Sequence, residues 1–247
     1  MNFKTLKTEF RDNVLHCWLH RPEKRNALNT EMLNELIQLF GDLYIGDKVA
    51  VLVLRGWGKV FSAGADLSGM SDISGKSEIE LKNEAGLFYD CFDALYRLHI
   101  PTICYVHGGI HGGANGLPAA CDYTLADSGA LFSFGEVGLG LVPATVAPFV
   151  VRRTGVIKAK RMMLGGYTFG AEEALNSGLI DFITNEEEEE KKISEIAGQI
   201  LSNAPGALSA TKKLLIEIEE KPDTEKLKEL CTGLIARARI SDEAKKE

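Results

Sequence analysis

A glycine-rich stretch in the middle of the chain carries the first candidate chemistry. Residues Tyr105–Asp122 read YVHGGIHGGANGLPAACD, and the apolar, strand-like run Thr102–Val106 leads into them. Four glycines fall within six residues, Gly108, Gly109, Gly112 and Gly113, before the small, helix-compatible residues 114–121. The first N–H groups of a helix have no partner inside it, so such a turn can bind an oxygen that gains negative charge. Because glycine lets a ligand approach this backbone, we predict that Gly113 presents one N–H.

The same stretch has a plain alternative, which is a tight turn with close packing and no ligand. Its spacing alone favours neither interpretation. Pro118 adds a constraint, because proline fits a helix without losing a backbone hydrogen bond only in the first turn. We therefore expect the helix to begin near residues 115–117 or to be kinked there.

Two further segments place polar groups among apolar residues and glycines. Residues Val60–Leu67, VFSAGADL, follow the buried-looking strand Val49–Arg55 after a short Gly-Trp-Gly turn. Residues Ser133–Pro143 contain one carboxylate, that of Glu136. An apolar site raises the pKa of a carboxyl group and lets it carry a proton near neutral pH, so Glu136 is an acid–base candidate. The structural alternative is an ion pair with either arginine of the Arg152–Arg153 pair.

In their order and spacing, these three segments resemble the crotonase superfamily, the enoyl-CoA hydratase/isomerase family. FSAGADL is the most family-specific piece, and Arg21–Leu28, RPEKRNAL, extends the resemblance over roughly residues 3–240. The resemblance implies an α/β fold, a crotonase-like spiral of β-β-α units with a C-terminal helical region. The pattern becomes all-helical near residue 190, which we take as the boundary between residues 1–190 and 191–247. The resemblance implies that the first part is the spiral core with the active site and that the second is a trimerisation or lid region.

The resemblance also assigns roles to individual residues. It implies that the backbone N–H groups of Ala65 and Gly113 bind the thioester oxygen as it gains charge, and that Glu136 moves the proton. Losing one such donor typically costs about 10²–10³ in rate. The substrate would further contact Lys24, Arg25, Ala27, Ala63, Asp66, Leu67, Gly112 and Gly116. Solvated surface charge for the two cations and a local cap for the aspartate are the alternatives.

Position 116 departs from the family pattern. Hydratases with two glutamates carry the second one three residues after the oxyanion glycine, where this chain has Gly116. Hydration with one carboxylate then requires another polar group, or the substrate itself, to orient water. One carboxylate is sufficient to move a double bond, since a single base can take a proton at one carbon and return it at another. Together with Gly116, the string Glu136–Ala144 resembles the subgroup for branched substrates of the methylglutaconyl-CoA kind.

Three functions therefore remain open at this point. The resemblance implies an enoyl-CoA hydratase that uses Glu136 as proton donor and acceptor, and a Δ3,Δ2-enoyl-CoA isomerase is the alternative. A non-catalytic acyl-CoA-binding protein is the alternative of another class. The resemblance implies an acyl-CoA thioester as the ligand in each case, with CoA as part of the substrate and no separate cofactor, and a homotrimer or dimer of trimers.

The histidines near the glycines do not form a metal motif. His107 and His111 are four residues apart, but there is no H-E-x-x-H sequence and no further ligand at a suitable spacing. We expect hydrogen-bonded loop histidines and no metal site. As a further hypothesis, His111 could orient water in place of the missing glutamate. Tyr89 and Asp93, four residues apart on a predicted helix, line the acyl pocket or simply pack in the core.

Composition limits the class of protein. A chain of 247 residues can bury one sizeable core. Its net charge of −7 argues against binding to nucleic acid or to anionic membranes. Five cysteines without a C-x-x-C motif predict reduced thiols in a cytoplasmic compartment. Glu9 and Asp12 make the first residues unlike a signal peptide. Family members usually carry another short apolar tail, so the resemblance implies a naturally short or a truncated chain.

The remaining pattern predicts the elements that position these residues. We expect a β-hairpin from residues 3–10 and 14–19 and a strand at 49–54 that is buried on both faces. Asn29 is the expected N-cap of a helix whose end Gly41 and Gly46 mark. Further strands are predicted at residues 122–126 and 130–134, and helices at 78–99, 155–164, 171–177, 188–202, 206–220 and 224–239. Gly178 is the expected C-cap of the helix before it.

Overall fold

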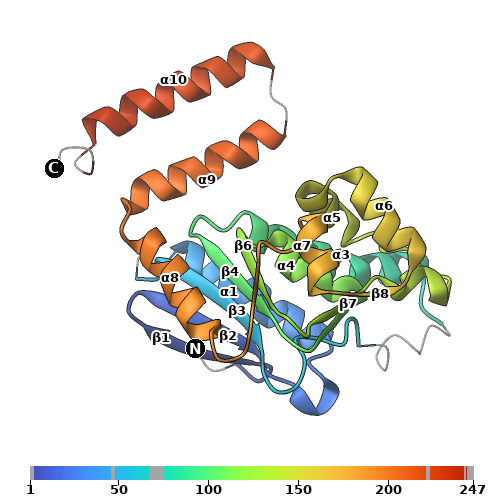
Figure 1. The fold of residues 1–247 in the computed structure, drawn as a ribbon. Helices are drawn as coiled ribbons and strands as arrows, with labels where there is room; N and C mark the ends of the chain where they lie inside the picture. The colour runs from blue at the N-terminus through green and yellow to red at the C-terminus, as the bar shows by residue number, and fades with distance from the viewer. Residues whose placement is uncertain (1–2, 46–47, 67–74, 221–222, 242, 244–247) are drawn as a thin grey trace.

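The main sheet runs through the centre of the molecule (Figure 1). The computed structural model describes residues 3–45, 48–66, 75–220, 223–241 and 243. The six strands of this sheet lie in the order β1-β2-β3-β4-β6-β9. They are β1 (Leu6–Arg11), β2 (Val14–Leu19), β3 (Val51–Gly56), β4 (Thr102–Val106), β6 (Tyr123–Asp127) and β9 (Phe182–Thr184). The first two form the predicted antiparallel hairpin, and the other neighbouring pairs are parallel.

A smaller sheet lies at the ends of these strands. It contains β5 (Gly109–His111), β7 (Leu131–Ser133) and β8 (Thr168–Gly170). The chain passes from a strand of the main sheet to one of the small sheet and then to a helix. It does so in β4, β5 and α4 (Gly116–Ala120), and again in β6, β7 and α5 (Ala147–Thr154). This arrangement confirms the predicted α/β spiral of β-β-α units.

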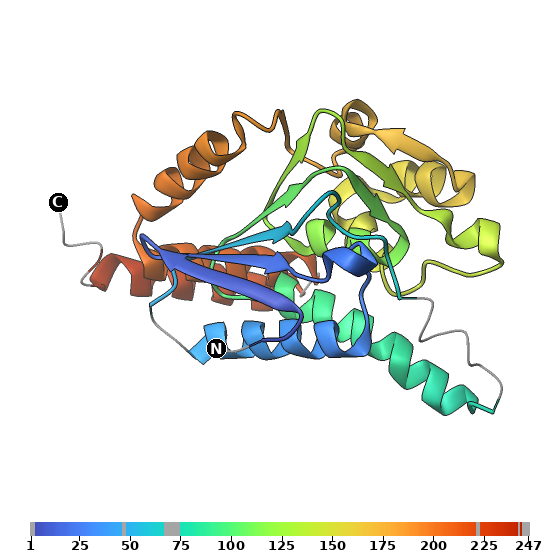
Figure 2. The same ribbon diagram turned by 90° about the horizontal axis from the view of Figure 1, so that it is seen from below.

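Helices cover both faces of the main sheet, which explains why every residue of its central strands β3 and β4 is buried. Every residue of β3 is buried, as its continuous apolar pattern predicts. One face packs against α1 (Thr30–Ile45), α3 (Glu78–Tyr96) and α4. The other face packs against α8 (Glu189–Leu201), whose Ile193 and Ile196 contact the cluster that contains Val51 and Val53. Figure 2 shows α1 and α3 side by side beneath the sheet.

The first helix begins as predicted, and it ends between the two glycines that were expected to mark its end. The side chain of Asn29 accepts a hydrogen bond of 2.9 Å from the Met32 N–H, so it caps α1. The prediction that Gly41 marks the end was wrong, because the helix continues through it to Ile45. Leu43, which follows Gly41, is buried in the core and holds this last turn there, which outweighs the weak helix propensity of glycine. Gly46 lies outside the described residues.

Most of the other predicted elements are present, with shifted ends. The helices include α6 (Val156–Gly165) and α7 (Ala171–Ser177), and Gly178 ends α7 with a φ of 81°. The prediction missed α5 and the short strands β5, β8 and β9. These strands have three residues each, too few to show a period in the sequence.

Two C-terminal helices extend away from the sheet (Figure 1). They are α9 (Pro205–Glu219) and α10 (Thr224–Ile240), and none of their described side chains is buried. Leu215 and Ile235 are 60% and 54% exposed. Since α8 packs on the main sheet, the part of the chain that lacks a core of its own begins at α9. The division at residue 190 stays a prediction.

Candidate active site

Two loops that are far apart in the sequence lie side by side at the edge of the small sheet. Ser62 pairs with Ile110 in a parallel bridge, through hydrogen bonds of 3.2 Å from Ser62 N–H to Gly109 O and from His111 N–H to Ser62 O. A Cβ on Gly64 would lie 2.7 Å from the carbonyl oxygen of His111, and its φ of +94° suits only glycine. The two predicted donors lie at matching positions: Ala65 is three residues after Ser62, and Gly113 is three residues after Ile110.

The residues on either side of Ala65, Gly64 and Asp66, form backbone hydrogen bonds with Leu28. The Leu28 N–H donates to Gly64 O at 2.8 Å, and the Asp66 N–H donates to Leu28 O at 2.9 Å. In a parallel pair the residue between two such bonds points its own N–H to the opposite side. The Ala65 N–H therefore faces away from Leu28, and the described part of the chain offers it no acceptor.

Gly113 lies in the opening turn of a helical segment. A 3-10 helix covers Gly112–Asn115 and continues into α4, with Pro118 in the first turn of α4. This confirms the expected helix start near residues 115–117. The N–H groups of a first turn have no partner inside the helix, so the Gly113 N–H is available to a ligand.

Glu136 lies beside this turn. It is the second residue of a 3-10 helix, Gly135–Leu139, and its Oε1 is 3.1 Å from where a Cβ on Gly112 would be. Its Oε2 is buried and has no hydrogen-bond partner among the described residues. Burial raises the pKa of this carboxyl above its ordinary value, and the hydrogen bond with its own backbone lowers it to a smaller extent. Such a carboxyl can hold and release a proton near neutral pH.

The alternative for Glu136, an ion pair with a nearby arginine, does not occur in the described structure. Arg152 instead pairs with Glu219 at 3.3 Å, and Arg153 pairs with Asp181. Because both guanidinium groups have these other carboxylates, Glu136 is not one half of a structural ion pair with either of them.

Asn115 joins the glycine turn to the segment that carries Glu136. Its side chain is fully buried, and Nδ2 donates to Gly112 O at 2.9 Å and to Ser133 O at 3.0 Å. One amide group thus fixes the turn before Gly113 relative to the strand that leads to Glu136. Sequence reasoning missed this residue, although a lone amide in a run of small residues was the available signal.

A second buried asparagine holds the loop expected to meet CoA. The Nδ2 of Asn26 donates to Trp57 O at 2.9 Å and to Val60 O at 3.0 Å. The Ala63 N–H donates to Arg25 O at 2.8 Å, so the loop with Lys24, Arg25 and Ala27 lies against the Ala63–Asp66 turn. Lys24 and Arg25 are exposed, and Ala27 is buried.

The other residues predicted to line the substrate site have different partners in the structure. Asp66 forms an ion pair of 2.9 Å with Arg21, in which both side chains are mostly buried, so it stabilises the loop junction. Leu67 lies outside the described residues. Tyr89 packs its ring against Phe149 at 5.4 Å between centroids, and Asp93 pairs with Arg97.

Comparisons with known proteins show the family to which the chain belongs. The family profile described as enoyl-CoA hydratase/isomerase matches residues 9–235. The chain belongs to the enoyl-CoA hydratase/isomerase family. A short-chain-enoyl-CoA hydratase from Clostridium acetobutylicum is 33% identical over 218 residues, which are 87% of this chain and 82% of that protein.

Two further relatives complete the comparison. The crystal structure of an enoyl-CoA hydratase from Shewanella pealeana has a TM-score of 0.93 and 31% identity, and the match covers 98% of this chain and 91% of that one. A mitochondrial Delta(3,5)-Delta(2,4)-dienoyl-CoA isomerase from Mus musculus is 27% identical, over 98% of this chain and 77% of that protein. The fold is thus the crotonase fold, and the relatives include both hydratases and isomerases.

The position of the missing glutamate in this crotonase is closed by an aromatic ring. Gly116 is buried, and a Cβ on it would lie 2.4 Å from Cε2 of Phe92. Phe88, one turn earlier on α3, lies 3.9 Å from where a Cβ on Gly113 would be. The rings of Phe88 and Phe92 thus line the side of the candidate site next to these two glycines, and we call them the carbon wall.

The two histidines of the glycine stretch have hydrogen-bond partners. His107 Nε2 lies 2.8 Å from Gly58 O, and His111 Nδ1 lies 2.8 Å from Ser133 Oγ. Burial lowers the pKa of His111, and the charge of Arg25 adds to this effect. The described residues contain no group of three or more side chains that could hold a metal ion. Within the described ranges, every helix is too short or too polar to span a bilayer.

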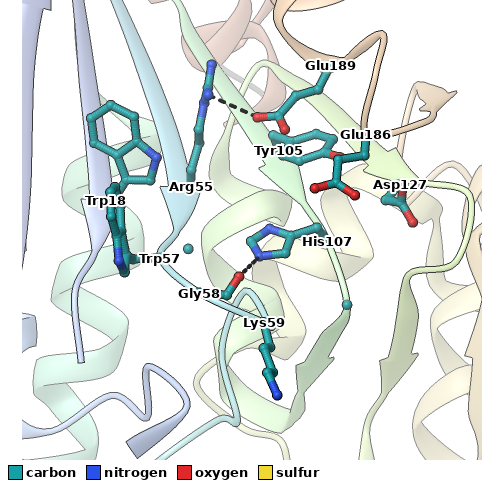
Figure 3. Close-up of a pocket in the computed structure, with 12 residues that line it drawn as sticks. Trp18, Arg55, Trp57, Gly58, Lys59, Tyr105, His107, Asp127, Glu186 and Glu189 are labelled. Carbon is teal, nitrogen blue, oxygen red and sulfur yellow. Dashed lines mark hydrogen bonds and ion pairs between the residues drawn. The ribbon is translucent and has the colours of Figure 1, made fainter. Parts of the chain in front are cut away.

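A separate cavity of about 630 Å³ lies at the ends of the main-sheet strands (Figure 3). Trp18, Trp57 and His107 form part of its lining, together with Arg55 and Glu189, which are paired at 3.0 Å. Ala65, Gly113 and Glu136 are not among its lining residues, so this cavity is distinct from the candidate active site.

Proposed function

We propose that this protein is an enoyl-CoA hydratase that adds water to a 2-enoyl-CoA thioester with Glu136 as its one catalytic carboxyl. The observation that supports this proposal most strongly is the position of Glu136. Its Oε2 is buried without a partner among the described residues, and its carboxyl lies beside Gly112, where the two candidate donor loops meet. In this proposal the N–H groups of Ala65 and Gly113 bind the thioester oxygen. They stabilise the enolate that forms when a nucleophile adds at Cβ.

The proton steps follow from this placement. The water oxygen bonds to Cβ, and the π electrons of the double bond move through Cα to the thioester oxygen. Glu136 takes a proton from the attacking water and delivers one to Cα, so that the carboxylate returns to its first state. No cofactor takes part beyond the CoA that the substrate carries.

The loop contacts and the C-terminal helices complete the proposal. The CoA part lies along Lys24, Arg25 and Ala27, against the turn from Ala63 through Asp66 to Leu67. The exposed apolar side chains of α9 and α10, Leu215 and Ile235 among them, support a homotrimer or a dimer of trimers. We place the protein in the cytoplasm, because its five cysteines are all free.

A Δ3,Δ2-enoyl-CoA isomerase is the second candidate, and one observation favours it. Gly116 has no side chain, and the Phe92 ring fills the adjacent space, so a second acid–base group is missing at that position. Isomerisation needs only one base, which removes a proton at Cα and returns it at Cγ. The carbon wall made by Phe88 and Phe92 suits this reaction as well.

The test compares wild-type enzyme with Glu136→Gln on three substrates. Crotonyl-CoA and the branched 3-methylglutaconyl-CoA report hydration, and 3-hexenoyl-CoA reports isomerisation. We expect Glu136→Gln to lower turnover about 10²–10⁴-fold with binding of the CoA thioester largely intact. Glu172→Gln, a change at an exposed glutamate, is the control that should leave turnover unchanged.

Each outcome decides between the candidates. Loss of 2-enoyl absorbance indicates hydration, and its appearance from 3-hexenoyl-CoA indicates isomerisation. Tight binding of acyl-CoA without either change would indicate a non-catalytic acyl-CoA-binding protein. Normal turnover by Glu136→Gln would remove the catalytic assignment.

A further inference from the structure

Two aromatic side chains of α3 pack over two glycines of the candidate site. Phe88 and Phe92 are four residues apart and so lie on one face of the helix. Gly113 and Gly116 are three apart in the helical segment that faces them. The separation from each glycine's ideal Cβ position is 3.9 Å to Phe88 Cδ1 and 2.4 Å to Phe92 Cε2.

Glycine is needed at 116 for steric reasons only. Its φ of −62° and ψ of −31° are ordinary helical values that any residue adopts. Three ring atoms of Phe92 lie 2.4–2.6 Å from where its Cβ would be, which is closer than carbon atoms can approach. A side chain at 116 is therefore possible only if the Phe92 ring moves.

The Phe92 ring is held in place by its neighbours. It is fully buried, and it meets the ring of Phe88 edge to face at 6.3 Å and that of Phe149 at 5.7 Å between centroids. Such aromatic contacts favour one arrangement of the rings. The ring thus closes this position in the folded protein.

The carbon wall also limits where water can be held. An ordered water needs about two to four polar partners. Near this wall, His111 Nδ1 is bonded to Ser133 Oγ, and Asn115 Nδ2 donates to two backbone carbonyls. Asn115 Oδ1 and Glu136 Oε2 are buried without a partner among the described residues, so these two oxygens are the acceptors left for a water molecule there. The ring of Phe92 offers water no acceptor beside Gly116.

We propose that Phe92 is a reaction-specificity residue, whose ring excludes a second acid–base group from the position beside Gly116 and leaves water there to be activated by Glu136 alone. This inference rests on the proposed enoyl-CoA chemistry. Glu136 then works alone, and the ring shifts the balance of products toward isomerisation. In hydration, water adds its oxygen to Cβ while a proton joins Cα. In isomerisation, one proton leaves Cα and one joins Cγ as the double bond moves, with no water consumed.

The test uses one substrate that reports both reactions. From 3-hexenoyl-CoA, isomerisation gives 2-hexenoyl-CoA, and hydration of that product gives 3-hydroxyhexanoyl-CoA. The partition ratio is the rate of hydration divided by the rate of isomerisation. Both rates come from one preparation, so the fraction of folded enzyme does not change the ratio.

Four proteins carry the comparison: wild type, Phe92→Ala, Gly116→Glu and the double variant Phe92→Ala/Gly116→Glu. Gly116→Glu alone should lower the thermal midpoint by roughly 4 °C or more, because the added side chain meets the ring. The double variant should recover much of that loss. Its partition ratio should exceed that of Phe92→Ala by about tenfold or more, as a second carboxyl can now act on water.

A matched control separates acid–base chemistry from a change of shape. Phe92→Ala/Gly116→Gln has nearly the same volume but cannot titrate, so it should keep the partition ratio of Phe92→Ala. The pH profile of kcat/KM should gain a second titrating group only in the variant with glutamate. Phe92→Leu alone, a mild change, should raise the ratio by about two- to threefold through partial opening of the wall.

Two results would overturn the inference. One is a thermal midpoint of Gly116→Glu equal to that of the wild type, because the Phe92 ring would then leave room for a side chain at position 116. The other is an unchanged partition ratio in Phe92→Leu or in the double variant. If wild-type enzyme turns over neither the 2-enoyl nor the 3-enoyl thioester, the proposed function itself fails, which is a separate result.

Discussion

The donor loops and the C-terminal helices are built by opposite means. The loops around Gly64 and Gly112 are fixed by backbone pairing between Ser62 and Ile110 and by the buried amide of Asn115. Helices α9 and α10 have no buried described side chain and expose Leu215 and other apolar residues. The contacts that hold the two loops together thus lie within one chain, whereas the C-terminal helices leave large apolar side chains exposed, a pattern typical of surfaces that bind other proteins.

The largest effect should come from breaking the contact between the two loops. Gly64→Ala places a Cβ 2.7 Å from the His111 carbonyl oxygen at a φ of +94°, so the loops must separate. We expect turnover to fall by about 10²–10³, as for loss of one oxyanion donor. Gly198→Ala is the control, because nothing lies within 4 Å of its Cβ position. Equal turnover in both variants would show that the loop contact does not position the donors.

Removing the amide of Asn115 should have a smaller but still clear effect. Asn115→Ala leaves two carbonyls, that of Ser133 and the partly buried one of Gly112, without this donor. The free energy of unfolding should fall by about 1–3 kcal/mol, and kcat by roughly tenfold through misplacement of Glu136. Chemical denaturation and steady-state kinetics measure the two effects. The exposed Asn203 also bonds to backbone carbonyls, and a loss in Asn203→Ala as large as in Asn115→Ala would contradict this assignment.

A change in α9 tests the other half of the comparison. Leu215 is 60% exposed, so Leu215→Glu should cost the isolated subunit little, within about 0.5 kcal/mol. If another copy covers this helix, the variant should have a lower mass in sedimentation velocity than the wild type. Lys213→Glu, at a more exposed position of the same helix, should keep the wild-type mass. Equal masses for Leu215→Glu and wild type would mean that this residue is not covered.

The smallest effect concerns pH and stability. The pKa of Glu136 is raised on folding, chiefly by burial, so its protonated form favours the folded state. That contribution is present below the ordinary pKa of 4.5 and is lost as the pH rises through the folded value. Glu136→Gln should therefore raise the thermal midpoint near neutral pH, by at most about 4 °C, and leave it unchanged at pH about 4. A variant less stable than wild type at neutral pH would contradict this sign.

The features that could be predicted from the sequence are those that depend on a local pattern of residues. The run of apolar residues into the glycines, and the position of Pro118, were sufficient to place a strand, a turn and a helix start correctly. The hairpin and the amphipathic helices follow from their periods in the same way. Ala65 and Gly113 were singled out as donors by the family motifs, and their roles stay predictions.

What the sequence could not predict depends on contacts between distant segments. Phe92 lies 24 positions before Gly116, and no local pattern indicates that its ring fills the space there. The bonds of Asn115 to Ser133 likewise cross between elements. Gly41 does not end α1, because Leu43 beyond it is buried in the core and outweighs the low helix propensity of glycine.

The most direct measurement is a crystal structure of the protein with acetoacetyl-CoA, a thioester that it cannot hydrate. We predict that the thioester oxygen lies about 2.7–3.1 Å from the backbone nitrogens of both Ala65 and Gly113, with the Glu136 carboxyl next to the acyl carbons. A thioester oxygen that contacts neither nitrogen, or a bound acyl group remote from Glu136, would contradict the account.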